Sequence, residues 1–477
     1  MAPARRKVAP ARENSRPERK VRTIFKAIKT TISNRLWVPP LITGIIGAVA
    51  AWFFAGITLD PTSAFSNFLW PGDTSAAASM LGFVASSMLT VLTTTVSMTL
   101  IVLQVASGSF SHQLLRDYIQ SRAIKGIFAV FIGVFVYALV LQRSVSAEAR
   151  ETAPQLGMTV ALLLVFSAIG TFVWYISAVV RMVRVDAIIE RVAERATKLM
   201  RAHREEWPEA NEVPEIPNHA VDVRGHTSGY VRSVATREAA LWAQEHEVTV
   251  VFTVAPGDTV SAGQTLAWLW NPDAGEARPE LREEDLDEFI STYIQIEAER
   301  VSDQDIRLSL HQLADIGVRS LSPGSNDPTT GVHVIAQATP VLRRLVSDPL
   351  QNEVVFDDAG TARAVVATPT VRDFLVDFVV PLRRYCSTAP EVTIELLRLL
   401  VVIEEGIDDS PGAKVDDLAG FVDSERQQLL EGAKQGFVHQ ADLELLKPLL
   451  SVEGLRSTQR VKGPAGDVIE ESPEDDA

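Results

Sequence analysis

Two ionisable side chains, His311 and Asp315, stand four residues apart in a stretch whose apolar spacing predicts a helix. Side chains at positions i and i+4 lie on the same helix face, so this imidazole and this carboxylate could hold a metal ion. A zinc site uses three or four protein ligands, and no third ligand stands nearby in the sequence. A solvated or intersubunit face with an Asp315–Arg319 ion pair, worth about 0.3 kcal/mol, explains the same residue types. We therefore predict neither a metal nor a cofactor.

The segment from Ser322 to Pro328 has the sequence SPGSNDP, whose residue types suit a turn followed by a helix start. Asp327 is suited to cap the helix and Pro328 to occupy its first position. Backbone amides left free at a helix start can also bind an anion. Capping explains this composition without a ligand, and a ligand-binding turn or a subunit contact is the alternative. The candidate residues of that alternative are Ser322, Asn326, Asp327 and Asp315.

Hydroxyl side chains recur along the stretch from Ser75 to Ser107, whose thirty-three residues include no Asp, Glu, Lys, Arg or Pro. A helix of this length spans about 50 Å, which is more than the ~30 Å of bilayer hydrocarbon. Steps of three, four and seven residues place its polar side chains on one helix face. These side chains are Ser79, Ser86, Thr90, Thr93, Ser97 and Gln104.

Two interpretations of this polar face stay open. Small and hydroxylated residues let membrane helices pack closely and hydrogen bond, and this needs no further function. If several copies surround an axis, the same face lines a water-filled path that passes ions with little charge selectivity. The candidate pore-lining residues are then Ser86, Thr90, Thr93, Ser97 and Gln104.

The sequence contains none of the motifs that indicate a familiar enzyme. It has no G-x-x-x-x-G-K-[ST] phosphate loop, no G-x-S-x-G nucleophile elbow, no H-E-x-x-H and no dinucleotide-binding loop. His226 stands alone between Gly and Thr and fits a polar turn residue. The interiors of the apolar stretches lack the Asp, Glu or Lys that a proton relay or a carboxylate-coupled transporter uses. We therefore expect no enzymatic activity.

The overall composition excludes several classes of partner and chemistry. The net charge of −15 and the pI near 5.1 indicate no general affinity for nucleic acid. The single cysteine, Cys386, excludes an intramolecular disulfide and a cysteine-based zinc site. A reducing compartment is expected for the soluble part.

Apolar stretches predict an α-helical membrane domain over residues 36–182. The expected spans are Trp37–Ile57, Ser75–Ser107, Ile124–Leu141 and Leu156–Val180. Lys and Arg gather before the first span, after the second and after the fourth. By the positive-inside rule, both termini face the cytoplasm. Residues 1–35 carry eleven Lys or Arg and two Glu, and we expect a disordered N-terminus against anionic lipid.

Beyond the membrane domain the composition changes several times. An amphipathic pattern over residues 183–202 predicts a stalk helix, and the Pro- and acid-rich residues 203–219 predict a linker. Residues 220–272 show β-branched alternation with Gly turns, which is typical of a small β domain. Residues 278–452 show helical periodicity, and residues 457–477 indicate an acidic, disordered tail.

The sequence VAPGDTVSAGQTLAWL, from Val254 to Leu269, resembles the strands of biotinyl/lipoyl-type barrel-sandwich domains. A carrier domain of that type needs a lysine at a hairpin tip, but there is no Lys between Lys198 and Lys414. The resemblance thus implies the scaffold without the swinging-arm chemistry. The expected fold is a set of four transmembrane helices plus a cytoplasmic α+β region, in which a small β barrel-like domain precedes an all-helical domain.

Three stretches carry a wider resemblance, namely TTTVSMTLIVLQVASGSFSHQLLRDYIQ, HTSGYV and RSLSPGSNDPTTG. They resemble a family of bacterial predicted membrane proteins, the domain of unknown function 2254. The resemblance runs from the first span to the helical region near residue 440. It implies a membrane protein and assigns no reaction, ligand or functional residue.

The leading hypothesis is a homo-oligomeric, channel-like protein in which the second spans surround the axis and ions or small solutes pass. The motive is the long, charge-free, hydroxyl-bearing helix joined to a large cytoplasmic region. The alternative is a membrane-anchored sensor or scaffold whose cytoplasmic domains bind a partner or ligand, without transport. An enzyme built on His311 and Asp315 is a third hypothesis. In each case the lipid bilayer is a partner.

Overall fold

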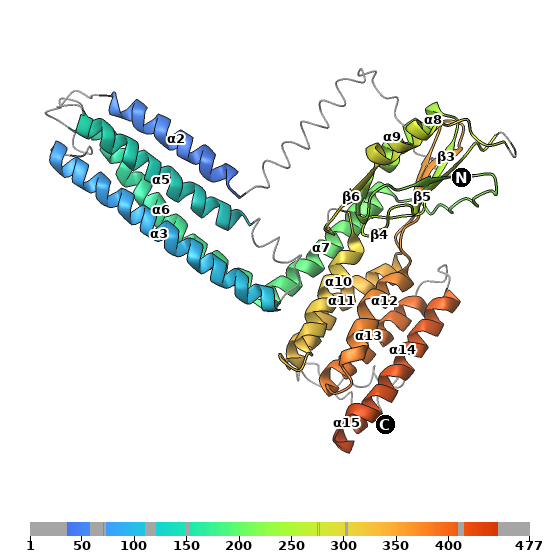
Figure 1. Ribbon diagram of the computed structural model, residues 1–477. Coiled ribbons are helices and arrows are strands. Elements are labelled where there is room, and N and C mark those ends of the chain that lie inside the picture. Colours follow the sequence, from blue (N-terminus) through green and yellow to red (C-terminus); the bar gives the residue numbers. More distant parts are fainter. Residues whose placement is uncertain are drawn as a thin grey trace, which may run out of the picture. The chain divides into compact units, whose positions relative to one another are not determined.

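The computed structural model describes residues 36–57, 70, 73–109, 121–147, 153–273, 275, 277–300, 304–408 and 415–446. The expected basic N-terminus and acidic tail, residues 1–35 and 457–477, lie outside these residues. The described chain divides into two compact units at residue 188 (Figure 1). We call residues 36–188 the N-terminal unit and residues 189–446 the C-terminal module.

The N-terminal unit is a bundle of four described helices, each long and apolar enough to cross a bilayer. They are α2 (Val38–Ala55), α3 (Thr74–Ser109), α5 (Arg122–Ala147) and α6 (Gln155–Val183). Helix α5 contacts each of the others and has 44% of its span buried, whereas α3 has 11% of its span buried. Helix α5 is therefore the centre of the bundle, and α3 presents most of its surface outward.

Small residues let α2 and α5 approach closely, as expected for membrane helices. A Cβ atom built at Gly47 would lie 2.5 Å from the carbonyl oxygen of Gly133. One turn earlier on α2, the hydroxyl of Thr43 donates to the carbonyl oxygen of Ala129 at 2.6 Å. Backbone contact and one interhelical hydrogen bond thus fix this crossing.

Helix α7 (Val185–Glu206) starts directly after α6, with only the extended residue Arg184 between them. Its apolar residues recur at the helical period and form a buried stripe. The buried residues are Ile188, Ile189, Val192, Ala193, Ala196 and Met200. The helix extends beyond the expected stalk, to residue 206, because HREE contains good helix formers and places His203 and Arg204 where the helix dipole favours cations.

The C-terminal module contains two open sheets, with strand orders β1-β5-β3-β8-β7 and β4-β2-β6. The strands are β1 (Val221–Arg224), β2 (Gly229–Val234), β3 (Thr249–Phe252), β4 (Thr259–Val260), β5 (Thr265–Trp270), β6 (Ile294–Glu297), β7 (Glu353–Phe356) and β8 (Ala362–Val366). Strands β3 and β8 run parallel, and the other neighbours run antiparallel. Neither sheet closes on itself, so the expected barrel is not supported, although β4 and β5 form within the Gly-rich stretch that resembles one.

Strands β6, β7 and β8 come from residues after 278, where we expected helices alone. The β7–β8 hairpin turns at Gly360, whose φ of 84° suits glycine, and β8 pairs with β3 with Val365 opposite Val251. The all-helical expectation does not hold for these residues. These stretches are short, and β6 pairs with β2 and β8 with β3, both of which lie far upstream in the sequence.

Helices α8 (Thr236–Glu245) and α9 (Glu283–Tyr293) pack on one face of the larger sheet (Figure 1). Their apolar side chains join those of the strands in one core, where the rings of Phe289 and Phe252 stack at 5.9 Å between centroids. This arrangement places the start of α8 beside the edge strand β7, which matters for the site described below.

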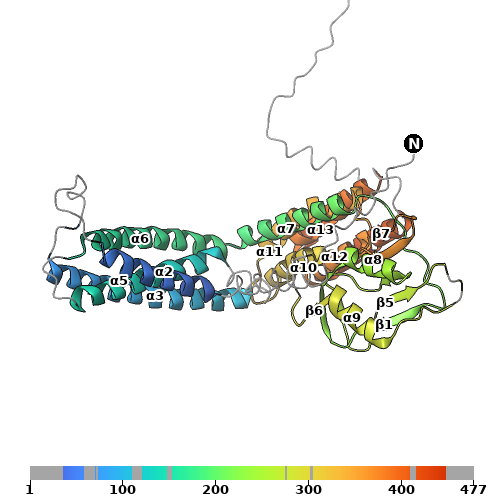
Figure 2. The same ribbon diagram turned by 90° about the horizontal axis from the view of Figure 1, so that it is seen from above.

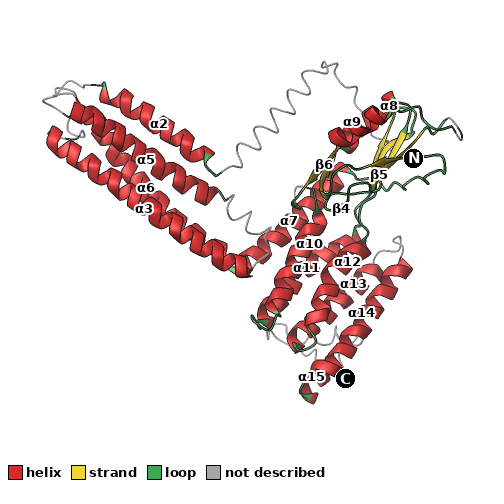
Figure 3. Cartoon of the chain, viewed as in Figure 1, coloured by secondary structure: helices red, strands yellow, loops and turns green. Residues whose placement is uncertain are grey.

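The remaining helices form a second layer of the module, coloured yellow to red in Figure 1 and drawn again in Figure 3. They are α10 (Ile306–Ser320), α11 (Pro328–Ser347), α12 (Val371–Tyr385), α13 (Pro390–Asp408), α14 (Val415–Gly436) and α15 (Gln440–Leu446). Helix α11 packs on α13, and α10 packs on both α11 and α12. The β7–β8 hairpin separates α11 from α12 in the chain and ties this helical layer to the sheet.

Candidate functional site

The hydroxyl face of α3 points away from the helix bundle. All five candidate pore-lining residues are exposed on the surface of the N-terminal unit, as is Ser79. The five are Ser86, Thr90, Thr93, Ser97 and Gln104. The Ser86 hydroxyl donates to the carbonyl oxygen of Gly82 at 2.7 Å, and the Thr90, Thr93 and Ser97 hydroxyls bond one turn back in the same way at 2.9 to 3.0 Å. Each hydroxyl proton is thus used within the helix, and the oxygens stay available to accept from outside.

The interior of the single bundle contains no polar path among the residues that the structure describes. Its buried side chains are apolar apart from Thr95, Tyr137 and Tyr175. The Tyr137 hydroxyl donates to the carbonyl oxygen of Gly157 at 2.8 Å, and the Tyr175 hydroxyl bonds to Thr99 at 2.5 Å. A water-filled route through one copy of this bundle has no lining, so any route through α3 faces requires more than one copy.

In the C-terminal module, the turn from Ser322 to Asp327 is an exposed connection between α10 and α11. Asp327 is the N-cap of α11, since its carboxylate accepts from the amide of Thr330 at 3.1 Å and from the hydroxyl of Thr330 at 2.7 Å. The Thr330 hydroxyl holds the pKa of the Asp327 carboxyl below its ordinary value. Asn326 adopts a φ of 43°, a conformation that Asn tolerates better than most residues. The local structure therefore uses these residues as a turn and a cap.

Asp315 and His311 lie half-buried on α10 and are not brought into a metal site. Among the described residues, no group of three or more His, Cys, Asp or Glu side chains could hold a metal ion. His226 makes a surface pair with Asp287, with its Nε2 atom 2.7 Å from the carboxylate. Both side chains of that pair are more than half exposed.

Replacing Asp327 with alanine should remove about 1 kcal/mol of stability from the C-terminal module, the usual cost of losing a helix N-cap. Asparagine caps equally well, so Asp327→Asn should be nearly neutral. Urea unfolding of the full chain measures both. Equal losses in the two variants would contradict a capping role and show that the charge itself serves a ligand or a subunit contact.

A site that sequence reasoning missed lies at the C-terminal end of α7, the helix labelled in Figures 1 and 2. The Nε2 atom of His203 lies 2.8 Å from the carbonyl oxygen of Gln351, and its Nδ1 atom lies 3.9 Å from the Glu353 carboxylate on β7. Arg204 pairs with the Asp348 carboxylate at 2.9 Å and also donates to the carbonyl oxygen of that residue, just after α11. We call this set of contacts the α7 joint.

Two further residues of α8 complete the α7 joint. The Thr236 hydroxyl donates to the second oxygen of the Glu353 carboxylate at 2.5 Å. The Arg237 guanidinium pairs with Glu206 at 3.3 Å and lies 5.1 Å from the centre of the Trp207 ring. The end of α7 is therefore held by the sheet edge, by α8 and by the end of α11 at once.

Burial sets the electrostatics of the α7 joint. Desolvation raises the pKa of the Glu353 carboxyl, and the Thr236 hydrogen bond opposes that rise. Desolvation also lowers the pKa of Arg204, and the charge of Asp348 opposes this shift. The joint thus contains a largely enclosed guanidinium paired with Asp348, and an enclosed carboxylate that lies near the His203 imidazole and within the field of Arg237.

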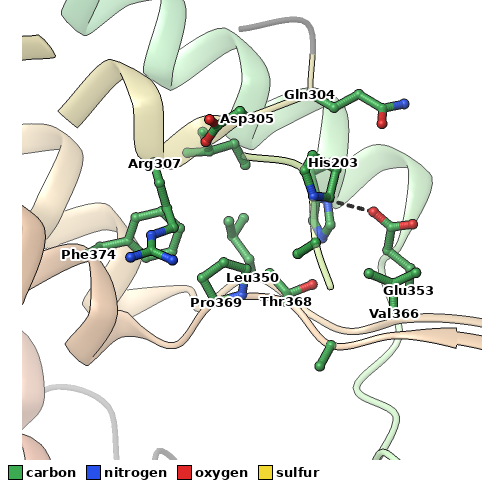
Figure 4. A pocket seen from close by; sticks show the side chains of 14 residues that line it. His203, Gln304, Asp305, Arg307, Leu350, Glu353, Val366, Thr368, Pro369 and Phe374 are labelled. Atoms are coloured by element: carbon green, nitrogen blue, oxygen red, sulfur yellow. Dashed lines mark ion pairs between the residues drawn. The ribbon is translucent and has the colours of Figure 1, made fainter. Parts of the chain in front are cut away.

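Next to the joint, a small pocket opens between α7, the sheet and the start of α10 (Figure 4). Its volume is about 30 Å³, which is room for about two water molecules and far below the several hundred Å³ of an organic ligand site. Its polar lining includes His203, Glu353, Asp305, Arg307 and Thr368. This pocket can hold water molecules, which can carry protons, and it has no room for an organic substrate.

On the far side of the pocket, ion pairs join the start of α10 to its neighbours. The fully buried Asp305 carboxylate pairs with Arg300 at 2.6 and 3.2 Å and caps α10 by accepting from the amide of Leu308. Burial raises the pKa of Asp305, and the Arg300 guanidinium opposes that rise. Arg307 forms a two-pronged pair with Asp377 on α12, at 2.7 and 3.0 Å.

The fold and these sites define an α-helical membrane protein with a C-terminal α+β module. A family model described as predicted membrane protein (DUF2254) matches residues 33–401. Because the match covers most of the chain, the protein belongs to that family, as the sequence resemblance suggested.

The chain is also similar over nearly its whole length to mycobacterial proteins. It is 26% identical over 448 residues to the uncharacterized protein MT1328 of Mycobacterium tuberculosis strain CDC 1551 and to the uncharacterized protein Mb1321c of Mycobacterium bovis. Each alignment covers 92% of this chain and 83% of the relative. No solved structure matches the chain.

Proposed function

We propose that the protein is a homo-oligomeric, channel-like protein of the bacterial inner membrane, in which α3 helices of several copies surround a path for ions or small solutes. The observation that carries this proposal is the outward direction of the α3 hydroxyl face. The side chains of Ser86, Thr90 and Ser97 lie on the outside of a bundle whose own interior is apolar. The C-terminal module would then act as the regulatory part.

The hydrogen bonding of this face leaves an acceptor on each hydroxyl oxygen. A hydroxyl that donates to its own helix gains nothing from lipid, yet its oxygen can accept from water or replace part of an ion's hydration shell. The face has no fixed charge, so a path lined by it would discriminate weakly between cations and anions. Close packing of α3 against a second copy, without a path, uses the same residues and is the competing arrangement.

The expected orientation places the regulatory module on the cytoplasmic side. Lys and Arg gather in residues 1–35, between Arg116 and Lys125 at the start of α5, and at the end of α6, and the positive-inside rule assigns these segments to the cytoplasm. Both termini and the C-terminal module would then face the cytoplasm. Labelling of engineered surface cysteines from either side of intact cells tests this orientation.

Replacing Thr90 and Ser97 together with leucine should reduce ion flux through reconstituted protein about tenfold or more, because an apolar ring closes a path by dewetting. Flux of small ions into liposomes, measured under varied voltage and tension, is the readout. Ser177→Leu is the matched control, since Ser177 is an exposed hydroxyl on α6 that also bonds to its own helix. Flux in that control should stay unchanged.

Absence of flux for any small ion in the unaltered protein would contradict the channel. The sensor or scaffold alternative would then take its place, and the α7 joint is the observation that favours it. A helix that leaves the last span and is fastened to the module at its far end can carry a signal without transport.

A further inference from the structure

The geometry of His203 leaves a place for one proton in the α7 joint. The carbonyl oxygen of Gln351 can only accept, so the Nε2 atom of His203, 2.8 Å away, must carry a hydrogen and donate it. In a neutral imidazole the other nitrogen, Nδ1, then has a bare lone pair. That lone pair faces the Glu353 carboxylate at 3.9 Å (Figure 4).

Two acceptors that face each other in an enclosed site repel unless a proton lies on one of them. The side chains are only 14% and 18% exposed, so bulk water does little to relieve this contact. The second oxygen of Glu353 is already used by the Thr236 hydroxyl and provides no alternative. A proton on Nδ1 or on the carboxyl converts the repulsion into an attraction.

We propose that the α7 joint is a proton-binding site, in which one proton held between His203 and Glu353 fastens the end of α7 to the sheet edge and its loss loosens this attachment. The proposal goes beyond transport and holds whether or not the protein conducts ions.

The charged groups around His203 and Glu353 are engaged with one another, so the shared proton is what joins His203 to Glu353. From α7, Glu206 faces Glu353 and disfavours its ionised form, while Arg237 on α8 favours it. Glu206 and Arg237 pair with each other at 3.3 Å, and their effects on the pKa of Glu353 are opposite in direction. Arg204 is engaged by Asp348. Across the pocket on α10, Asp305 and Arg307 are engaged by Arg300 and Asp377.

The expected pH dependence follows from the direction in which burial moves the carboxyl. Burial raises the pKa of Glu353 above its ordinary value near 4.5. A carboxyl whose pKa is raised in the folded state contributes stability at low pH, and this contribution is lost as pH rises through the raised pKa. The attachment of α7 should therefore be firm in acid and weaken toward neutral and alkaline pH. The pocket beside the pair has room for the water that would deliver and remove the proton.

The consequence reaches the rest of the chain through α7 itself. Only Arg184 separates α7 from the last membrane helix, and the apolar stripe of α7 is buried. Loosening its far end would free the terminal turns, residues 203–207, to fray or shift. Acidification would then be sensed as a change in how firmly the end of α7 is attached to the sheet edge.

Hydrogen exchange measured by mass spectrometry on the full chain in lipid nanodiscs tests this proposal. Protection of the amides in residues 203–207 and 351–355, corrected for intrinsic exchange, should fall about tenfold when the pH is raised from about 5 to about 8, because the attachment weakens once the shared proton is lost. Elsewhere in the module, protection should change little. Equal protection of the joint at both ends of the range would overturn the proposal.

Two variants and a matched control separate the shared proton from a general effect of pH. In Glu353→Gln, a neutral amide accepts from Thr236 and needs no proton opposite His203, so the pH dependence should disappear. His203→Gln should remove the pH dependence as well. This variant alone decides the question if Glu353→Gln does not fold. His226→Gln alters an exposed His–Asp pair and should leave the pH dependence intact. Persistence of the pH dependence in His203→Gln would overturn the proposal.

Discussion

Alanine at position 305 should destabilise the C-terminal module by about 3–5 kcal/mol, the largest effect of a single substitution that we expect in this module. The Asp305 side chain is fully buried and forms a two-pronged pair with Arg300 at the start of α10. Removing it leaves a guanidinium that is only 15% exposed without its carboxylate. The main cost in free energy comes from keeping the charge of Arg300 away from water without a partner.

Two smaller losses add to the effect of Asp305→Ala. The carboxylate caps α10 through the amide of Leu308, and a lost cap costs about 1 kcal/mol. The carboxylate also fills the space beside Gly257, whose φ of 99° only glycine adopts readily. The Pro-Gly-Asp turn between β3 and β4 therefore rests on this same side chain.

Urea unfolding of the full chain in detergent measures the stability of the module. Asp222→Ala is the matched control, because the Asp222–Arg224 pair lies on the surface with the arginine 65% exposed, and such pairs contribute about 1 kcal/mol or less. A loss in Asp305→Ala no larger than that of the control would contradict a structural role for the buried pair.

Leucine at position 47 should disrupt the packing of α2 on α5 and lower the stability of the membrane bundle by at least about 1–3 kcal/mol. A first side-chain carbon at this position already meets the carbonyl oxygen of Gly133 at 2.5 Å, and that neighbour is backbone, which cannot rotate away. The helices would have to separate, and the 2.6 Å hydrogen bond from Thr43 to Ala129 would break.

Thermal unfolding in detergent, followed by the amount of protein that stays monodisperse, provides the measurement. Gly170→Leu is the control, since a Cβ atom at Gly170 on α6 meets no atom within 4 Å. The control should unfold at the temperature of the unaltered protein. If Gly47→Leu does the same, close contact between α2 and α5 does not hold the bundle together.

The parts of the fold that follow from local pattern were predictable. Long apolar stretches without charge predict membrane helices, and the four spans appear where they were expected. The β-branched stretch with Gly turns predicts strands, and β3, β4 and β5 form there. The hairpin from Glu353 to Val366 was not predicted, because its stability depends on pairing with β3 far upstream. Whether a sheet stays open or closes into a barrel also depends on pairing between strands that are far apart in the sequence.

The candidate sites also divide into features that local sequence pattern predicts and features that depend on contacts between distant residues. Periodicity predicts Ser86, Thr90 and Ser97 on one face of α3, but it does not say whether that face points into the bundle or, as the structure has it, out of it. The α7 joint joins His203 to Glu353 and Arg204 to Asp348 across long separations in the sequence. The one local signal was the helix-forming composition of HREE, which continues α7 past residue 202 and brings His203 to the sheet edge and Arg204 to the end of α11.

Cryo-electron microscopy of the full chain in lipid nanodiscs tests the proposed assembly most directly. We predict a symmetric ring in which α3 of each copy faces the axis and Ser86, Thr90 and Ser97 line a continuous water-filled path. Single copies in lipid, or an assembly with a dry and sealed centre, would contradict the channel.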